Sequence, residues 1–187
     1  MPDNTIEFDT AVTTTVTGAH RALVGLSRDL FDHPEIAWEE ERSARRVADQ
    51  LADAGFTVTG GYCDLPTAFS ATVGSGELHL GLCAEYDALP GLGHACGHNL
   101  ISAITVGAAT ALAPLADDLG ITLHVLGTPA EEGGGGKIEM LERGGFDGLH
   151  AAAMVHPGPV DVARARPFAV SHSHIEYQGK SAHAAAY

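Results

Sequence analysis

The segment Cys83-Ala-Glu-Tyr-Asp87-Ala-Leu-Pro90-Gly-Leu-Gly-His94-Ala-Cys96-Gly-His98-Asn99 joins two apolar runs. The run over residues 78–84 predicts a strand, and the run over residues 100–115 predicts an Ala-rich buried helix. A strand followed by a helix is typical of an α/β fold. The connecting segment holds two carboxylates, two imidazoles and a thiol, which are side chains suited to a metal-activated hydrolase.

Short apolar strands and helices alternate along the rest of the chain. Such alternation predicts a three-layer α/β domain, in which functional residues lie at the carboxyl ends of the strands. We expect further strands over residues 56–59, 68–73, 121–127 and 151–155, and helices over residues 17–30, 39–54 and 138–143.

The character of the sequence changes after Ala163, which predicts a second domain. The stretch Phe168 to Tyr177 looks like a new strand, and Gly179-Lys-Ser-Ala-His183 follows it. We therefore predict a catalytic domain over residues 1–165 and the start of a smaller domain over residues 166–187.

Composition and charge exclude several classes of function. The 187 residues, 45% of them hydrophobic, are enough for one globular domain with a core. A net charge of -14 disfavours binding to nucleic acid or to an anionic membrane surface. No signal peptide is visible, and no apolar run approaches the roughly 18 residues that span a bilayer. We therefore expect a cytoplasmic protein with no nucleic-acid or membrane partner, and the three cysteines do not suggest a disulfide framework.

The glycine-flanked turn at Cys96 and His98 is the first candidate site. A Cys-x-His pair can direct both side chains at one ion, although a free thiol beside solvent-facing histidines fits the pair equally well. Asp87 follows an expected strand and could fix the tautomer of a ligand histidine, or it could begin a turn. Glu85 could equally be a solvated residue, and His94 is a less certain ligand than the pair.

Two later strand ends carry the remaining candidates. Glu131 and Glu132 follow the strand expected over residues 121–127, and adjacent carboxylates in extended backbone point in opposite directions. One could bind a metal ion while the other acts as general base, or both could lie in an acidic surface loop. His156 leaves an apolar strand and suits either a site or a capped position in the core. Gly136-Lys137 is not a phosphate loop, because the required first glycine is replaced by glutamate.

Six motifs in a fixed order resemble one family. The chain resembles the di-metal metallopeptidases that include aminoacylases, carboxypeptidase G-type enzymes and indole-acetyl-amino-acid hydrolases. It is most similar to the branch of aminobenzoyl-glutamate hydrolase, where Asn99 also fits the pattern. The motifs are His33-Pro-Glu35 with Glu39, Asp87-Ala-Leu-Pro90, His94-Ala-Cys96-Gly-His98, Glu131-Glu132-Gly-Gly, His156-Pro-Gly-Pro and Gly179-Lys-Ser-Ala-His183.

The resemblance implies a fold, a cofactor and roles for individual residues. The fold would be a zinc-peptidase-like α/β catalytic domain with a small α/β lid that mediates formation of a homodimer. One or two Zn²⁺ or Mn²⁺ ions would act on N-acyl or N-aroyl amino acids or small peptides. The metal ligands would be Cys96, His98, Glu132 and His156, with Glu131 as general base, Asp87 as orienting residue and His183 of the lid near the substrate.

Two other functions stay open on the sequence. The resemblance covers only about the first half of a family member, so the catalytic domain is expected to be incomplete and to lack a last metal-binding histidine. The chain could therefore be a catalytically inactive truncated fragment, poorly soluble because its lid ends in an unpaired strand. Alternatively, Cys96 could be the nucleophile of a thiol hydrolase, with His98 or His94 as its base.

Overall fold

The computed structural model describes residues 4–163, 166, 169, 173 and 175–180. The chain separates into two units, Met1–Pro157 and Gly158–Tyr187, and in its described part every helix and strand lies in the first unit. The predicted domain boundary at residues 165–166 stays a prediction. The strand expected over residues 168–177 includes residues outside the described ones.

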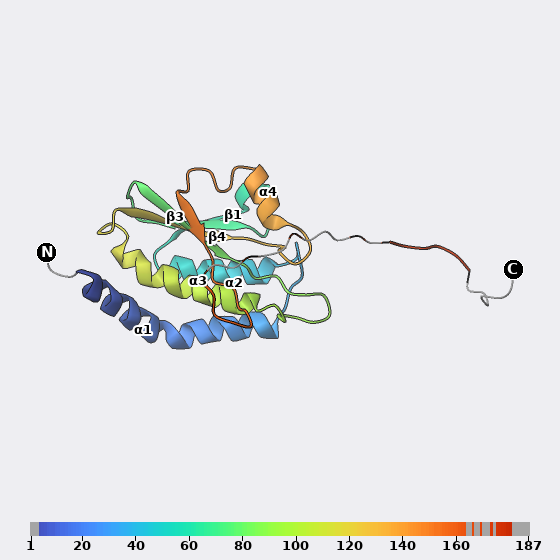
Figure 1. Ribbon diagram of the computed structural model, residues 1–187, viewed down its shortest axis with the longest axis horizontal. Coiled ribbons are helices and arrows are strands. Elements are labelled where there is room, and N and C mark those ends of the chain that lie inside the picture. The colour runs from blue at the N-terminus through green and yellow to red at the C-terminus, as the bar shows by residue number, and fades with distance from the viewer. Residues whose placement is uncertain (1–3, 164–165, 167–168, 170–172, 174, 181–187) are drawn as a thin grey trace. The chain divides into compact units, whose positions relative to one another are not determined.

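A mixed five-stranded sheet forms the centre of the first unit (Figure 1). Its order is β1-β2-β4-β3-β5, in which β1, β2 and β4 pair antiparallel and β4, β3 and β5 run parallel. The carboxyl ends of the three parallel strands therefore meet at one edge of the sheet. The strands are β1 (Thr57–Gly60), β2 (Phe69–Val73), β3 (Leu78–Ala84), β4 (Ile121–Gly127) and β5 (Ala151–Ala153).

Helices lie on both faces of the sheet. The helices α1 (Asn4–Asp32), α2 (Glu41–Asp53) and α3 (His98–Leu112) gather on one face, and α4 (Gly136–Glu142) lies on the other (Figure 1). Successive side chains of a strand point to opposite faces. Val125 of β4 accordingly packs in the core with α1, α2 and α3, whereas Leu126 packs with Met140 of α4. The predicted α/β class is confirmed.

The apolar helix α3 is a core element. The stretch His98–Leu115, which adds the 3-10 turn Ala113–Leu115, is long and apolar enough to cross a membrane by length and composition alone. The expectation that no segment approaches this length is therefore wrong. Of this stretch 56% is buried inside the protein, as is typical of a core helix. Its Ser102 and Thr105 hydroxyls donate to the carbonyls of Glu85 and Cys83, at 2.6 and 2.9 Å, which fixes α3 against the end of β3.

Element boundaries differ from the predictions mainly at helix starts. The first helix begins at Asn4 rather than at residue 17, because its Thr-rich first half lacks the apolar periodicity on which the prediction rested. The helix α4 begins at Gly136, inside the glycine run, and β5 ends at Ala153 with exposed side chains.

Candidate active site

His98 and Asp87 form the buried centre of the site. His98 begins α3, Asp87 follows β3, and both are almost fully buried. The ring Nδ1 of His98 lies 3.0 Å from Asp87 Oδ1, and Asp87 Oδ2 accepts the backbone amide of Glu132 at 2.9 Å. Asp87 thus connects the start of α3 to the loop after β4. The contact expected of an orienting carboxylate is present, with Nε2 of the imidazole left facing the site.

Three carboxylates surround the free nitrogen of His98. Its Nε2 lies 3.3 Å from Glu85 Oε2, 3.6 Å from Glu132 Oε1 and 3.7 Å from Glu131 Oε2. Nε2 itself and the nearest oxygens of Glu85 and Glu132 are buried without a hydrogen-bond partner. Leaving a buried polar group unpaired costs about 1–3 kcal/mol, so three such atoms in one place indicate a missing cation.

Burial and charge act in opposite directions on these groups. Burial lowers the pKa of His98, but the hydrogen bond to Asp87 and the nearby carboxylates outweigh it and raise the pKa overall. Burial raises the pKa of Asp87, yet its bonds to His98 and to the Glu132 amide bring the pKa below the ordinary value. The pKa of Glu131 is raised by burial and by the charge of Glu85.

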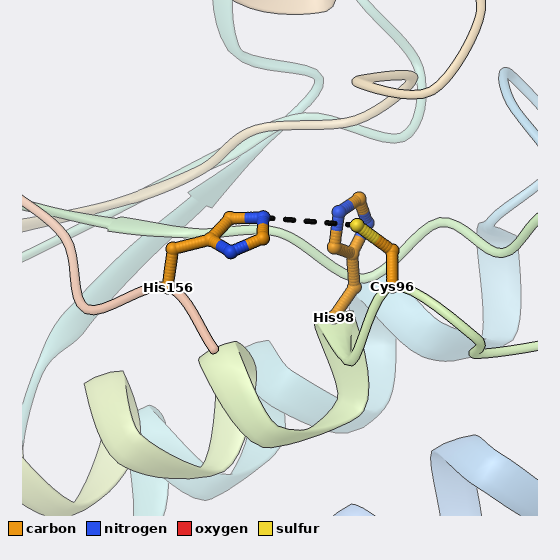
Figure 2. A group of neighbouring side chains, drawn as sticks. All are labelled: Cys96, His98 and His156. Atoms are coloured by element: carbon orange, nitrogen blue, oxygen red, sulfur yellow. Dashed lines mark hydrogen bonds between the residues drawn. The ribbon is translucent and has the colours of Figure 1, made fainter. Parts of the chain in front are cut away.

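Cys96 and His156 complete the site on its exposed side. Cys96 Sγ lies 3.7 Å from His156 Nε2 (Figure 2), and the donor atoms of these two residues and of His98 all lie within 4.8 Å of one another. Gly97, between Cys96 and His98, has φ 86°, and a Cβ atom there would lie 3.0 Å from Cγ of Pro157. A glycine at this position therefore permits both the turn and the close approach of the His156 segment.

The geometry does not favour the thiol-hydrolase alternative. In the part of the chain that the structure describes, Cys96 pairs with His156 and has no hydrogen bond to His94 or His98, the two expected bases. Burial and the carboxylates of Glu132, Glu131 and Glu85 raise the pKa of Cys96 to about 12. A nucleophilic thiol needs the opposite shift, whereas a metal ion would stabilise the thiolate directly.

The donor set fits a metal ion. Two ligand atoms at about 2.0–2.3 Å from one tetrahedral ion lie about 3.5 Å apart. The separations of 3.6 Å between His98 Nε2 and Glu132 Oε1, and of 3.7 Å between Cys96 and His156, agree with that spacing. Glu85, His98 and Glu131 form a second group within 4.8 Å, so both groups share His98.

The sequence analysis missed two residues of this site. Glu85, for which a solvated position was one expectation, is 1% exposed, and its Oε1 contacts Nζ of Lys137 at the start of α4. The strand β3 ends at Ala84, so the alternation that separated Glu85 from Asp87 no longer applies there. The one signal for Lys137 was its place directly after four glycines that return the chain to the sheet edge.

Other candidates fall elsewhere. His94 is buried with both ring nitrogens unpaired, but its nitrogens do not join either group of possible metal ligands in the described part of the chain. His183 lies outside the described residues, as do His172 and His174.

Comparisons with known proteins agree with this geometry. The sequence pattern described as Peptidase family M20/M25/M40 matches residues 81–183. Xaa-Arg dipeptidase of Mus musculus is 40% identical over 90% of this chain and 42% of its own length. A p-aminobenzoyl-glutamate hydrolase of Escherichia coli (strain K12) is 36% identical, over 86% of this chain and 37% of its own. The chain thus spans about two fifths of the length of these curated relatives.

Solved structures show the same fold. A Bacillus subtilis protein described as a dinuclear metal binding peptidase from the M20 family has a TM-score of 0.66 and 26% identity, over 73% of this chain and 42% of that one. The aminobenzoyl-glutamate utilization protein of Klebsiella pneumoniae has a TM-score of 0.69 at 21% identity, over 79% of this chain and 46% of that one, which supports the fold alone.

Proposed function

The chain belongs to the peptidase family M20/M25/M40, and we propose from this that it acts as a metal-dependent hydrolase on the amide bonds of N-acyl amino acids or small peptides. The resemblance to di-metal metallopeptidases expected from the ordered motifs is confirmed by the family match and by the relatives. The observation that carries the proposal is the buried, unpaired Nε2 of His98, which faces three carboxylates beside a thiol and a second imidazole.

Cys96, His98, Glu132 and His156 would hold one or two Zn²⁺ or Mn²⁺ ions. Sulfur, nitrogen and carboxylate oxygen together form a donor set that suits such borderline ions. A bound ion would polarise the amide carbonyl and increase the acidity of a water molecule. Asp87 would keep the Nδ1 of His98 protonated and its Nε2 directed into the site, since the two residues lie in hydrogen-bond contact.

Glu131 would carry the proton during hydrolysis. Its side chain is 43% exposed, so a water molecule and a substrate can reach the carboxylate. The raised pKa of Glu131 brings its basicity closer to the range in which a general base works best. Glu131 would take a proton from the attacking water and return it to the amine that leaves, which restores the carboxylate for the next cycle.

The substrate class follows from the chemistry that the relatives' names share. Xaa-Arg dipeptidase, p-aminobenzoyl-glutamate hydrolase and N-acetyl-L-cysteine deacetylase each name a compound with an amide at the nitrogen of an amino acid. An acyl or aroyl group on an amino acid is therefore the feature that we expect this site to accept.

Exchange of Glu131→Gln tests the proposal. We expect turnover of N-acetyl amino acids, 4-aminobenzoyl-glutamate or Xaa-Arg dipeptides to fall about 100- to 10,000-fold, since general-base catalysis contributes that much. Bound Zn²⁺ or Mn²⁺, measured by elemental analysis after dialysis, should not change. Glu142→Gln, an exposed carboxylate of α4, is the matched control. Full turnover by Glu131→Gln, or a protein that retains neither metal, would contradict the proposal.

A further inference from the structure

The loop that carries Glu131 and Glu132 has a constrained backbone. Ala130 is fully buried and has φ 54°, in the left-handed region that non-glycine residues rarely adopt. Its carbonyl accepts the amides of Gly134 at 3.0 Å and Gly136 at 3.3 Å, so the loop winds back on this residue. A strained conformation persists only where the surrounding structure holds it in place. The contacts at Ala130 therefore decide where the two carboxylates project.

Glu40 holds the loop at Ala130. This glutamate immediately precedes α2 and is completely buried, and its Oε1 accepts the backbone amide of Ala130 at 2.8 Å. Burial raises the pKa of Glu40, and its Oε2 has no hydrogen-bond partner among the described residues. Burying a carboxylate in this way is unfavourable unless its contacts compensate. The contact with Ala130 joins segments that are 90 residues apart in the sequence.

Glu40 does not have the usual role of a residue at a helix start. It stands at the N-cap position of α2, yet its side chain makes no capping hydrogen bond to that helix. Glu35 accepts the amides of Arg42 and Ser43 instead, at 3.1 and 2.7 Å. The carboxylate of Glu40 is thereby released from its own helix and directed at the loop.

Two buried carboxylates thus hold the backbone on either side of Glu131. Glu40 accepts the amide of Ala130, and Asp87 accepts the amide of Glu132. We infer that Glu40 is a positioning residue that, together with Asp87, aims the carboxylate of Glu131. This inference rests on the proposed function of Glu131 as general base. Glu40 itself touches neither His98 nor the other possible ligands in the described contacts.

The segment of Glu40 also supplies a spectroscopic probe of the loop. Trp38 is the one tryptophan of the sequence, and its indole lies against Gly134, where a Cβ atom would come within 2.4 Å of the indole nitrogen. A displacement of the loop therefore changes the surroundings of Trp38, which tryptophan fluorescence reports.

Three variants of the enzyme test the inference: Glu40→Ala removes the acceptor, Glu40→Gln keeps an oxygen acceptor, and Glu39→Ala changes an exposed neighbour as control. In Glu40→Ala we expect hydrogen-exchange protection of the Ala130 amide to fall about 10- to 100-fold, because a buried donor loses its partner. The emission of Trp38 should shift, and kcat should fall up to about 100-fold, since small misplacements of catalytic groups have such effects. KM and bound metal should stay within about threefold, and Glu40→Gln should restore all three readouts that Glu40→Ala changes.

The outcomes separate this inference from the proposed function. Normal Ala130 protection and normal kcat in Glu40→Ala would overturn the positioning role, as would a loss of protection spread evenly over β3 and β4. Turnover that survives Glu131→Gln would instead refute the base role, whatever the Glu40 variants do to the loop. If Glu40→Ala does not fold, Glu40→Asp withdraws the acceptor by one methylene and is measured in its place, with the same losses expected.

Discussion

Two groups of histidines are associated with the same pair of parallel strands, β3 and β4, and their surroundings differ. At the carboxyl end, His98 is fully buried and faces three carboxylates. Within the strands, His79 of β3 and His124 of β4 stack with ring centroids 5.1 Å apart, and His79 Nδ1 lies 2.9 Å from His124 Nε2. His150 accepts the backbone amide of His79. We call His79, His124 and His150 the sheet histidines.

The difference shows that neighbours decide what an imidazole does. Carboxylates raise the pKa of His98 despite its burial, whereas burial and the adjacent His79 lower the pKa of His124. Surroundings that favour a proton on an imidazole also favour a metal cation. The sheet histidines instead satisfy one another as neutral hydrogen-bonding groups, and in the described part of the chain neither group of possible metal ligands includes them.

The largest effect is expected from removing His98. The variant His98→Ala should weaken Zn²⁺ or Mn²⁺ binding at least about 100-fold, because both groups of possible ligands share this residue. The matched variant His124→Ala should leave the dissociation constant within about threefold. Isothermal titration with each metal measures both values. Equal losses in the two variants would break the distinction between the two groups.

An intermediate effect is expected from the partners of the two imidazoles. Asp87→Asn leaves the ring of His98 without its charged partner and should weaken metal binding about 10- to 100-fold, as the loss of such partners usually does. Thr72→Val removes the hydroxyl that lies 3.3 Å from His124 Nδ1 and should leave metal binding unchanged. Competition with a chromogenic chelator compares the two variants; unchanged affinity in Asp87→Asn would argue against its orienting role.

The smallest effect concerns the pH dependence of stability. The pKa of His124 is lower in the folded protein than its ordinary value, so the unfolded chain binds more protons at mildly acidic pH. His124 thus contributes stability above the unfolded pKa of about 6.5 that is lost as pH falls through the folded pKa. The groups that face it are His79 and Thr72. His124→Gln should flatten this part of the curve of unfolding free energy against pH in urea titrations, and an unchanged slope would contradict the assignment.

Local patterns were sufficient to predict much of the fold. The strands β3 and β4 and the helix α2 follow from runs of apolar residues with a clear period and from nearby stop signals. The meeting of Cys96, His98, Glu132 and His156 was predicted because each lies in or after a loop at a parallel strand end.

Contacts that depend on the third dimension were not predictable in the same way. The burial of Glu85 follows from where β3 stops, which is the least certain feature of any sequence pattern. The approach of Lys137 to Glu85 and of Glu40 to Ala130 joins residues 52 and 90 positions apart. The motif comparison emphasised Glu39, whereas the structure buries its neighbour Glu40, since a sequence motif does not say which of two adjacent side chains turns inward.

The hydroxyl bonds from Ser102 and Thr105 to the end of β3 have a consequence for the entropy of assembling the site. They fix the helix that carries His98 to the strand that leads to Asp87, so these two side chains are already immobilised before any ion binds. Immobilising a rotamer-rich side chain on binding costs about 0.5–1.5 kcal/mol. That penalty therefore falls on the exposed side chains of His156 and Glu131. Ion capture would begin at the rigid inner wall and finish when the outer side chains lose their rotational freedom.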